Sequence, residues 1–153
     1  MKYFGEKLEN INYKKRPGAY AILKRKEDHK IGIVTDGKDN FYLGGGIEEG
    51  ETVLAALKRE ALEEAGYQLK NLIPFEIVGS YLYSKTHGYL EVIANVYIAE
   101  LDRKMSEPIE QDHVLLWIEP TAYVGKMCRE WQEYILKIYM DKLEQEKVGD
   151  NYD

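Results

Sequence analysis

The sequence predicts an α/β (α+β) fold in which two helices pack against a β-sheet. Three observations support this prediction. Short apolar stretches of strand length are bounded by glycine and polar turns, residues 51–65 are strong helix formers, and an apolar stripe with helical spacing follows Pro120. The chain has 153 residues, the size of one domain, so we expect a single domain over 1–153.

The sequence of the first half of the chain predicts two neighbouring strands followed by a glycine-rich loop. Residues 19–24 and 31–34 are apolar and flank a polar turn at 26–30. Residues 44–46 are three consecutive glycines, which would weaken the interior of a helix or a strand. We therefore expect a loop at these glycines.

The second half of the chain predicts further strands and a closing helix. Gly66 is a suitable end for the helix at 51–65. Residues 89–99 alternate between apolar and polar side chains, as in a half-buried strand, and are expected to form a hairpin with 74–83. The remaining elements are expected to be a strand at 114–118, a helix from 120 to about 147 and a frayed end at 148–153.

Composition and charge exclude several classes of protein. The 21 Lys and Arg against 27 Asp and Glu give a net charge of −6 without a clustered basic run, so we expect no nucleic acid polymer as a partner. No apolar run approaches the ~20 residues that cross a bilayer, so no membrane partner is expected. Cys128 is the one cysteine, and the first residues lack an apolar signal core, which together predict a cytoplasmic protein.

Three acids of the helix at 51–65 indicate a metal site. Glu60, Glu63 and Glu64 stand at positions i, i+3 and i+4, so their carboxylates are neighbours about 110° from the centre of the apolar stripe. At ~5 Å and an effective dielectric of ~20, each like-charge pair costs on the order of 3 kcal/mol. Arg59 alone cannot balance these acids, whereas Mg²⁺ or Mn²⁺ suits an all-oxygen ligand set.

The spacing of this helix and the glycines before it matches a known pattern. The segment from Gly45 to Tyr67 fits Gx5Ex7REUxEExGU, and the fixed positions are Gly45, Glu51, Arg59, Glu60, Glu63, Glu64 and Gly66. It resembles the Nudix box of the Nudix hydrolases. The resemblance implies an α/β/α sandwich with a mixed sheet, a central helix that carries the box and a C-terminal helix. It also implies Mg²⁺- or Mn²⁺-dependent hydrolysis of a nucleoside diphosphate linked to another moiety.

The resemblance also assigns roles to individual residues. Glu60, Glu63 and Glu64, with the main-chain carbonyl of Gly44, are similar to the family's metal ligands. Arg59 resembles the arginine that orients these acids, with Glu51 as its partner. The general base is left open between Glu64, which lies in the box, and Glu110, which resembles a later-loop glutamate; Glu107 and His113 are weaker candidates. Two departures from the family, Leu43 in place of proline and Ala61 in place of a larger aliphatic residue, remove no ligand.

The substrate is less closely defined by the sequence. Gly45 and Gly46 allow a phosphate to approach the backbone, and Arg16 is a candidate phosphate ligand. Base stacking is expected from tyrosines of the predicted strands, of which the candidates are Tyr81, Tyr83 and Tyr97. The family's SQPWPFPQS signature of NADH hydrolases is missing.

Three functions remain open at this point. The first choice is a MutT-like pyrophosphohydrolase of a nucleoside triphosphate, oxidised nucleotides included. One alternative is a dinucleoside polyphosphate hydrolase, favoured by the place of Tyr83 after the box. The other is a non-catalytic nucleotide-binding module on the same fold, against which the intact acids argue. The helix containing Trp131 leaves a homodimer open.

Overall fold

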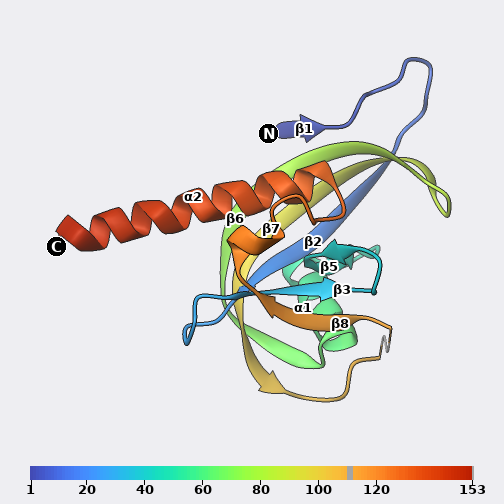
Figure 1. Ribbon diagram of the computed structural model, residues 1–153. Coiled ribbons are helices and arrows are strands. Elements are labelled where there is room, and N and C mark those ends of the chain that lie inside the picture. The colour runs from blue at the N-terminus through green and yellow to red at the C-terminus, as the bar shows by residue number, and fades with distance from the viewer. Residues whose placement is uncertain (110–111, 153) are drawn as a thin grey trace.

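The computed structural model describes residues 1–109 and 112–152, with side chains as far as residue 149 (Figure 1). The strands and helices follow one another along the chain as β1 (Lys2–Phe4), β2 (Lys14–Lys24), β3 (Ile31–Thr35), β4 (Asn40–Phe41), β5 (Leu43–Gly46), α1 (Val53–Glu64), β6 (Tyr67–Ser84), β7 (Gly88–Lys104), β8 (Val114–Ile118), the 3₁₀ helix η1 (Pro120–Tyr123) and α2 (Glu130–Tyr152). Neither described helix is long and apolar enough to cross a membrane.

The strands form one mixed sheet around β2. The strand order is β1-β6-β7-β2-β3-β4, and β5 and β8 pair with β2 and β3. β2 runs parallel to β7 from Lys14 to Leu23, while its later residues pair antiparallel with β5 and β3. β6 and β7 form a long antiparallel hairpin with register shifts near its base. The first residues of β2 therefore pair with β7 on one side. On the other side, β2 pairs with β5 from Gly18 onward.

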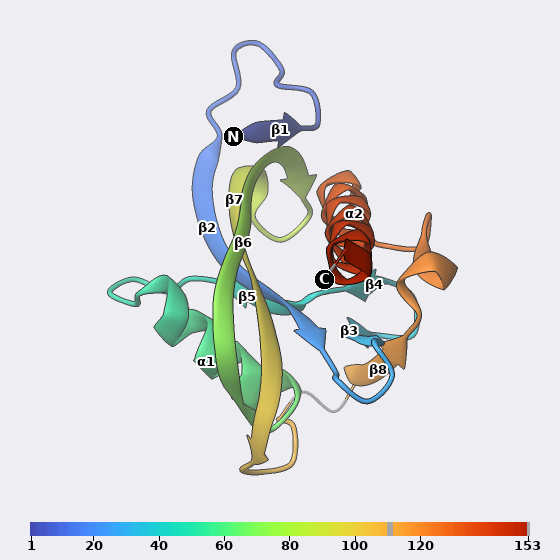
Figure 2. The same ribbon diagram turned by 90° about the vertical axis from the view of Figure 1, so that its left-hand side faces the viewer.

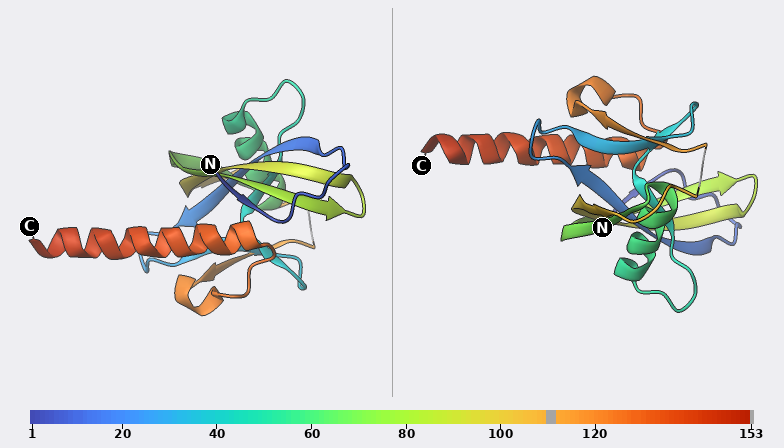
Figure 3. Two further views of the ribbon diagram at one scale, coloured as in Figure 1. Left: turned by 90° about the horizontal axis from the view of Figure 1, so that it is seen from above. Right: turned by 90° about the horizontal axis from the view of Figure 1, so that it is seen from below.

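The two helices cover opposite faces of the sheet, which confirms the predicted sandwich (Figures 2 and 3). Alternation along β2 explains why both faces are apolar: Ala19 and Ala21 point to the α1 side, and Ile22 points to the α2 side. The α1 side packs Leu57 and Ala61 against small residues of β2, whereas the α2 side packs large side chains around Trp131 and Ile135.

Several boundaries differ from the sequence-based expectations, and each difference has a tertiary cause. β2 begins at Lys14, five residues earlier than expected, because its polar start pairs with β7. The glycines at 44–46 form strand β5 instead of a loop. A Cβ on Gly44 would lie 2.1 Å from the carbonyl oxygen of Ala19, so this close pairing requires glycine. β6 begins at Tyr67, directly after Gly66 ends the helix with a φ of 76°.

The C-terminal helix also differs from the prediction. Residues 120–123 form the short η1, and α2 begins at Glu130 instead of continuing from 120. α2 then runs through Tyr152, across the positions from 148 onward that the sequence predicts to be frayed.

Candidate active site

Helix α1 begins beside the glycine strand and carries the candidate acids. Thr52 caps it, because its hydroxyl oxygen accepts a hydrogen bond from the main-chain N–H of Ala55 at 3.1 Å. The carboxylate of Glu51 just before the cap accepts two hydrogen bonds from the guanidinium of Arg59, at 2.8 and 2.9 Å. This bidentate pair holds the first turns of α1 against the loop that follows β5.

Arg59 connects the loop, the strand and the acids of the box. Besides Glu51, its guanidinium donates to the carbonyl oxygen of Gly46 at 3.0 Å, to Glu60 at 3.1 Å and to Glu63 at 3.3 Å. These partners raise the pKa of Arg59, chiefly through the hydrogen bonds with Glu51, and Arg59 in turn lowers the pKa of Glu51. The resemblance assigns Arg59 the role of orienting the acids, and its guanidinium contacts Glu51, Glu60 and Glu63.

Glu60 and Glu64 are the more deeply buried acids. The Glu64 side chain is 3% exposed, and its Oε1 accepts a hydrogen bond from the main-chain N–H of Gly44 at 2.9 Å. The Glu60 side chain is 12% exposed, and its burial raises the pKa of its carboxyl group although Arg59 acts in the opposite direction. Glu60 and Glu64 stand four residues apart on α1, and each contacts the glycine strand, Glu60 beside Gly45 and Glu64 at Gly44. The two carboxyl groups therefore lie side by side beneath the glycine strand.

Gly45 makes room for this arrangement. A Cβ on Gly45 would stand 2.6 Å from Oε1 of Glu60, which is closer than real Cβ contacts allow. The carbonyl of Gly44, the further ligand expected from resemblance, belongs to the same strand, whose N–H already bonds Glu64. Glycines at both positions thus allow buried carboxylates to approach the backbone.

The general-base candidates differ in where the structure places them. Glu64 lies within the cluster, and His113 stands next to it, with Nδ1 3.6 Å from Oε2 of Glu64 and its ring edge-on to Phe41. Glu107 is exposed and ion-paired with Lys104 at 2.9 Å. Glu110 lies outside the described residues.

A cleft of about 390 Å³ opens beside these acids, between the start of β2, the loop after β5 and the tip of the β6–β7 hairpin. Arg59 and Glu60 line one end, and Arg16 and Gly46 lie beside them. The remaining lining residues are Lys14, Lys15, Pro17, Ile47, Glu48, His87 and Leu90. Lysine, arginine and histidine thus outnumber the acids in the lining, which suits a ligand with several phosphate groups.

Sequence reasoning missed Lys14 and Lys15 as lining residues. The signal was present as the run Lys-Lys-Arg at 14–16, but these residues precede the apolar stretch that predicted the strand. Only the pairing of 14–18 with β7 turns them into a strand at the side of the cleft.

The tyrosine candidates do not line the cleft. Tyr97 lines a separate pocket with Pro74 and Phe75 and packs near the α1-side core. Tyr81 and Tyr83 lie on the outer part of β6, where they contact other tyrosines. The structure therefore brings Arg16, Gly45 and Gly46 to the acids and leaves the three tyrosines apart from them.

The donor atoms of the acid cluster fit Mg²⁺ or Mn²⁺. Carboxylates and a main-chain carbonyl are the oxygen ligands that these cations prefer, and two of the carboxylates are buried side by side. Among the side chains that the structure describes, those of residues 1–109 and 112–149, no three His, Cys, Asp or Glu already form a metal-binding group; Glu60 and Glu63 both contact Arg59.

The chain is similar to known proteins in sequence and in fold. A family model described as NUDIX domain matches residues 14–138. A stretch of 57 residues is 44% identical to the NAD-capped RNA hydrolase NudC of Pasteurella multocida (strain Pm70). That match covers 37% of this chain but only 19% of the relative, so the chain spans less than a fifth of that protein.

Solved structures show the same fold. A structure from work on MutT of Aliivibrio salmonicida and Vibrio cholerae superposes with a TM-score of 0.60 at 16% identity, covering 80% of this chain and 92% of that one. A NUDIX hydrolase from Nitrosomonas europaea gives 0.59 at 17% identity, over 84% and 90% of the two chains. A MutT protein from Bacillus halodurans gives 0.60 at 18% identity, over 80% of both.

Proposed function

The chain belongs to the Nudix family, and from that premise we propose that it is a metal-dependent hydrolase of a nucleoside diphosphate linked to a further group. The observation that carries the proposal is the buried pair Glu60 and Glu64, joined to Glu63 and Glu51 through Arg59, at one end of a cleft with cationic walls. Acids that served only to stabilise the fold would not require a cationic cleft beside them.

Each residue has a distinct task in the proposed reaction. Glu60, Glu63, Glu64 and the carbonyl of Gly44 would hold Mg²⁺ or Mn²⁺, which when bound would neutralise charge on the phosphates and make water a better nucleophile. Arg59 keeps the acids in place through its contacts with Glu51 and Gly46.

The bond changes are those of a phosphoanhydride hydrolysis. Water oxygen forms a bond to phosphorus, the bridging P–O bond breaks, and the leaving phosphate takes the electron pair. The proton of the attacking water passes to a carboxylate oxygen, either of Glu64 or of Glu110. Lys14, Lys15 and Arg16 line the cleft where they can pair with the phosphate oxygens.

The first substrate class we propose is a nucleoside triphosphate, oxidised nucleotides included. Its phosphate chain matches a cleft with the acid cluster at one end and Lys14, Arg16 and His87 in its walls. The fold shared with the MutT structures is compatible with this choice.

A second candidate is a dinucleoside polyphosphate or related dinucleotide. Tyr83 and Tyr89 contact each other with ring centroids 4.9 Å apart, on the same hairpin whose tip places His87 in the cleft. A second base could stack on these rings. The partial match to a NAD-capped RNA hydrolase favours a substrate of this kind.

One experiment separates these functions. The pure protein is incubated with nucleoside triphosphates (8-oxo forms included), dinucleoside polyphosphates and NAD, with Mg²⁺ or with EDTA, and phosphate products are followed. Metal-dependent release of pyrophosphate and a nucleoside monophosphate, fastest for a triphosphate, is the expected result. Faster cleavage of the dinucleotides would favour the second candidate. Tight nucleotide binding without turnover of any member would contradict both and favour the non-catalytic module.

A further inference from the structure

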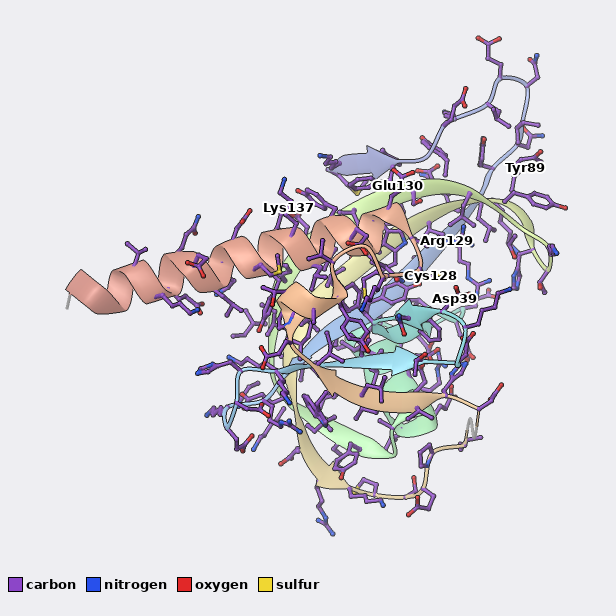
Figure 4. The ribbon with its side chains drawn as sticks, viewed as in Figure 1. Asp39, Tyr89, Cys128, Arg129, Glu130 and Lys137 are labelled. Atoms are coloured by element: carbon purple, nitrogen blue, oxygen red, sulfur yellow. The ribbon has the colours of Figure 1, made fainter. Side chains whose placement is uncertain are left out.

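Five tyrosines form a continuous group at the end of the sheet that carries the β6–β7 hairpin tip. We name this group the tyrosine platform; neighbouring rings are linked in the order Tyr83, Tyr89, Tyr13, Tyr81 and Tyr3. Their centroids are 4.9, 5.7, 5.0 and 5.2 Å apart along that series. Figure 4 shows Tyr89 at this end of the molecule, with its side chain directed away from the ribbon.

Strand register puts four of these rings on one face, and Tyr13, directly before β2, contacts two of them. Tyr83 is the partner of Tyr89, and Tyr3 on β1 is the partner of Gly79, which lies an even number of residues from Tyr83. This is the face that α1 covers further along β7, where Ala99 is buried in the α1-side core. Helix α1 does not reach the platform, so Tyr83 is 58% exposed, Tyr3 39% and Tyr89 36%.

The segments that carry the platform are basic in an otherwise acidic chain. Residues 1–18 and 80–91 contain six Lys and Arg against three Glu, although the whole chain has a net charge of −6. Lys7 lies over the ring of Tyr81, with Nζ 5.6 Å from the centroid. Lys14 and Lys15 directly follow Tyr13 and line the cleft, as does His87 near the hairpin tip. Lys7, Lys14, Lys15 and His87 thus border the platform and the cleft, while the carboxylate of Glu91 accepts a hydrogen bond from Tyr3 within the platform at 2.7 Å.

We propose that the tyrosine platform binds a single-stranded nucleic acid. Exposed aromatic rings beside a positively charged groove are the arrangement that stacks successive bases while pairing with their phosphates. An apolar protein segment fits this surface less well, because charged side chains border the rings and charged residues are depleted at the core of protein interfaces. The net charge of −6 led to the expectation that no nucleic acid polymer is a partner. That value is a sum over the whole chain, whereas the segments that carry the platform contain more basic than acidic residues.

Fluorescence anisotropy with labelled 12-nucleotide RNA and DNA strands tests this site. The buffer contains EDTA, so that turnover in the cleft plays no part and the outcome is independent of the proposed hydrolase activity. Wild-type protein should bind a strand with an affinity that falls as salt rises. A Tyr83→Ala and Tyr89→Ala double variant should bind about tenfold more weakly or worse, because each lost base–aromatic stack weakens binding.

Two variants serve as controls. The Tyr83→Phe and Tyr89→Phe double variant keeps both rings and should bind within about twofold of wild type, because stacking requires the ring. Tyr123→Ala removes a tyrosine on η1 that also has a lysine over its ring, with Lys126 Nζ at 5.3 Å from the centroid, but lies outside the platform; its binding should be unchanged. Circular dichroism melts check that each variant is folded.

Three results would overturn the proposal. One is failure to bind either strand at about 100 μM protein, the weak end of ordinary non-specific binding. Another is equal binding by the alanine double variant and wild type. The third is equally tight binding of a duplex or of inorganic polyphosphate, because neither offers unstacked bases and such binding would be due to charge alone.

Discussion

The carboxylate of Glu64, at the end of α1, accepts a hydrogen bond from the main-chain N–H of Gly44 at 2.9 Å. This contact joins the last acid of the helix to the glycine strand twenty residues earlier, and it places Glu64 beside the carbonyl that resemblance assigns as a metal ligand. With Arg59 bonded to Gly46 at 3.0 Å, the helix is tied to β5 at two points. The candidate site is therefore held by strand and helix together.

Replacing Glu64 by Gln tests its role in the reaction. The amide oxygen can still accept from Gly44, so the variant should fold, but one negative charge and one proton acceptor are lost. We expect kcat to fall by about 10²–10⁴-fold, the range for a lost acid–base group, with a thermal midpoint close to that of wild type. Steady-state kinetics with Mg²⁺ and thermal melts measure both quantities. A Glu64→Gln variant with the kcat of wild type would show that Glu64 takes no part in the reaction.

Glu110→Gln distinguishes the two general-base candidates. If the later loop supplies the base, kcat falls as severely as in Glu64→Gln while Mn²⁺ affinity stays at the wild-type value. If Glu64 is the base, Glu110→Gln should leave kcat nearly unchanged. Mn²⁺ titration followed by electron paramagnetic resonance supplies the second readout, since only loss of a metal ligand weakens Mn²⁺ binding.

Arg59→Lys should reduce kcat by roughly tenfold with a smaller change in KM. Lysine keeps the charge but cannot make the bidentate bonds to Glu51 and also reach Gly46, so the acids lose their orientation. Lys58→Arg, at the exposed preceding position, is the matched control and should be unchanged. An Arg59→Lys enzyme with wild-type kcat would show that the acids hold their positions without the guanidinium.

Gly45→Ala should reduce activity and metal binding more than it reduces the stability of the fold. The added methyl would stand 2.6 Å from Oε1 of Glu60 and must displace that side chain, so we expect kcat to fall about tenfold or more and Mn²⁺ to bind more weakly. Gly149→Ala on α2, where a Cβ meets nothing within 4 Å, should leave both unchanged. Equal activity of the two variants would mean that Glu60 is not needed in its present position.

Protonation of Asp28 provides a test away from the site. Hydrogen bonds from Arg25 lower the pKa of Asp28 from 3.8 to about 2. Because the folded-state value is the lower one, this pair contributes stability above pH ~4, and the contribution is lost as the pH falls through about 2. In Arg25→Gln, an NMR titration should find the Asp28 midpoint close to its ordinary value. Asp36, whose pKa is lowered by main-chain N–H groups, should titrate unchanged; an unmoved Asp28 midpoint would contradict the pairing.

The sequence alone determined the features that depend on local spacing. The adjacency of the i, i+3 and i+4 acids follows from helical periodicity, and the stop at Gly66 follows from the positive φ that glycine adopts at a helix end. The position of Arg59 eight residues after Glu51 is part of the same pattern, and the structure joins the two by hydrogen bonds.

Tertiary structure decided which residues from distant segments meet. Pairing with β7 made Lys14 and Lys15 part of a strand beside the cleft, and close approach to β2 made a strand of the glycines expected to form a loop. Tyr97 and Tyr83 share one face of the sheet, and the extent of α1 left Tyr97 near the α1-side core and Tyr83 exposed to solvent. These outcomes depend on contacts between residues far apart in sequence, which no local pattern encodes, because the energy of a strand pair belongs to both strands.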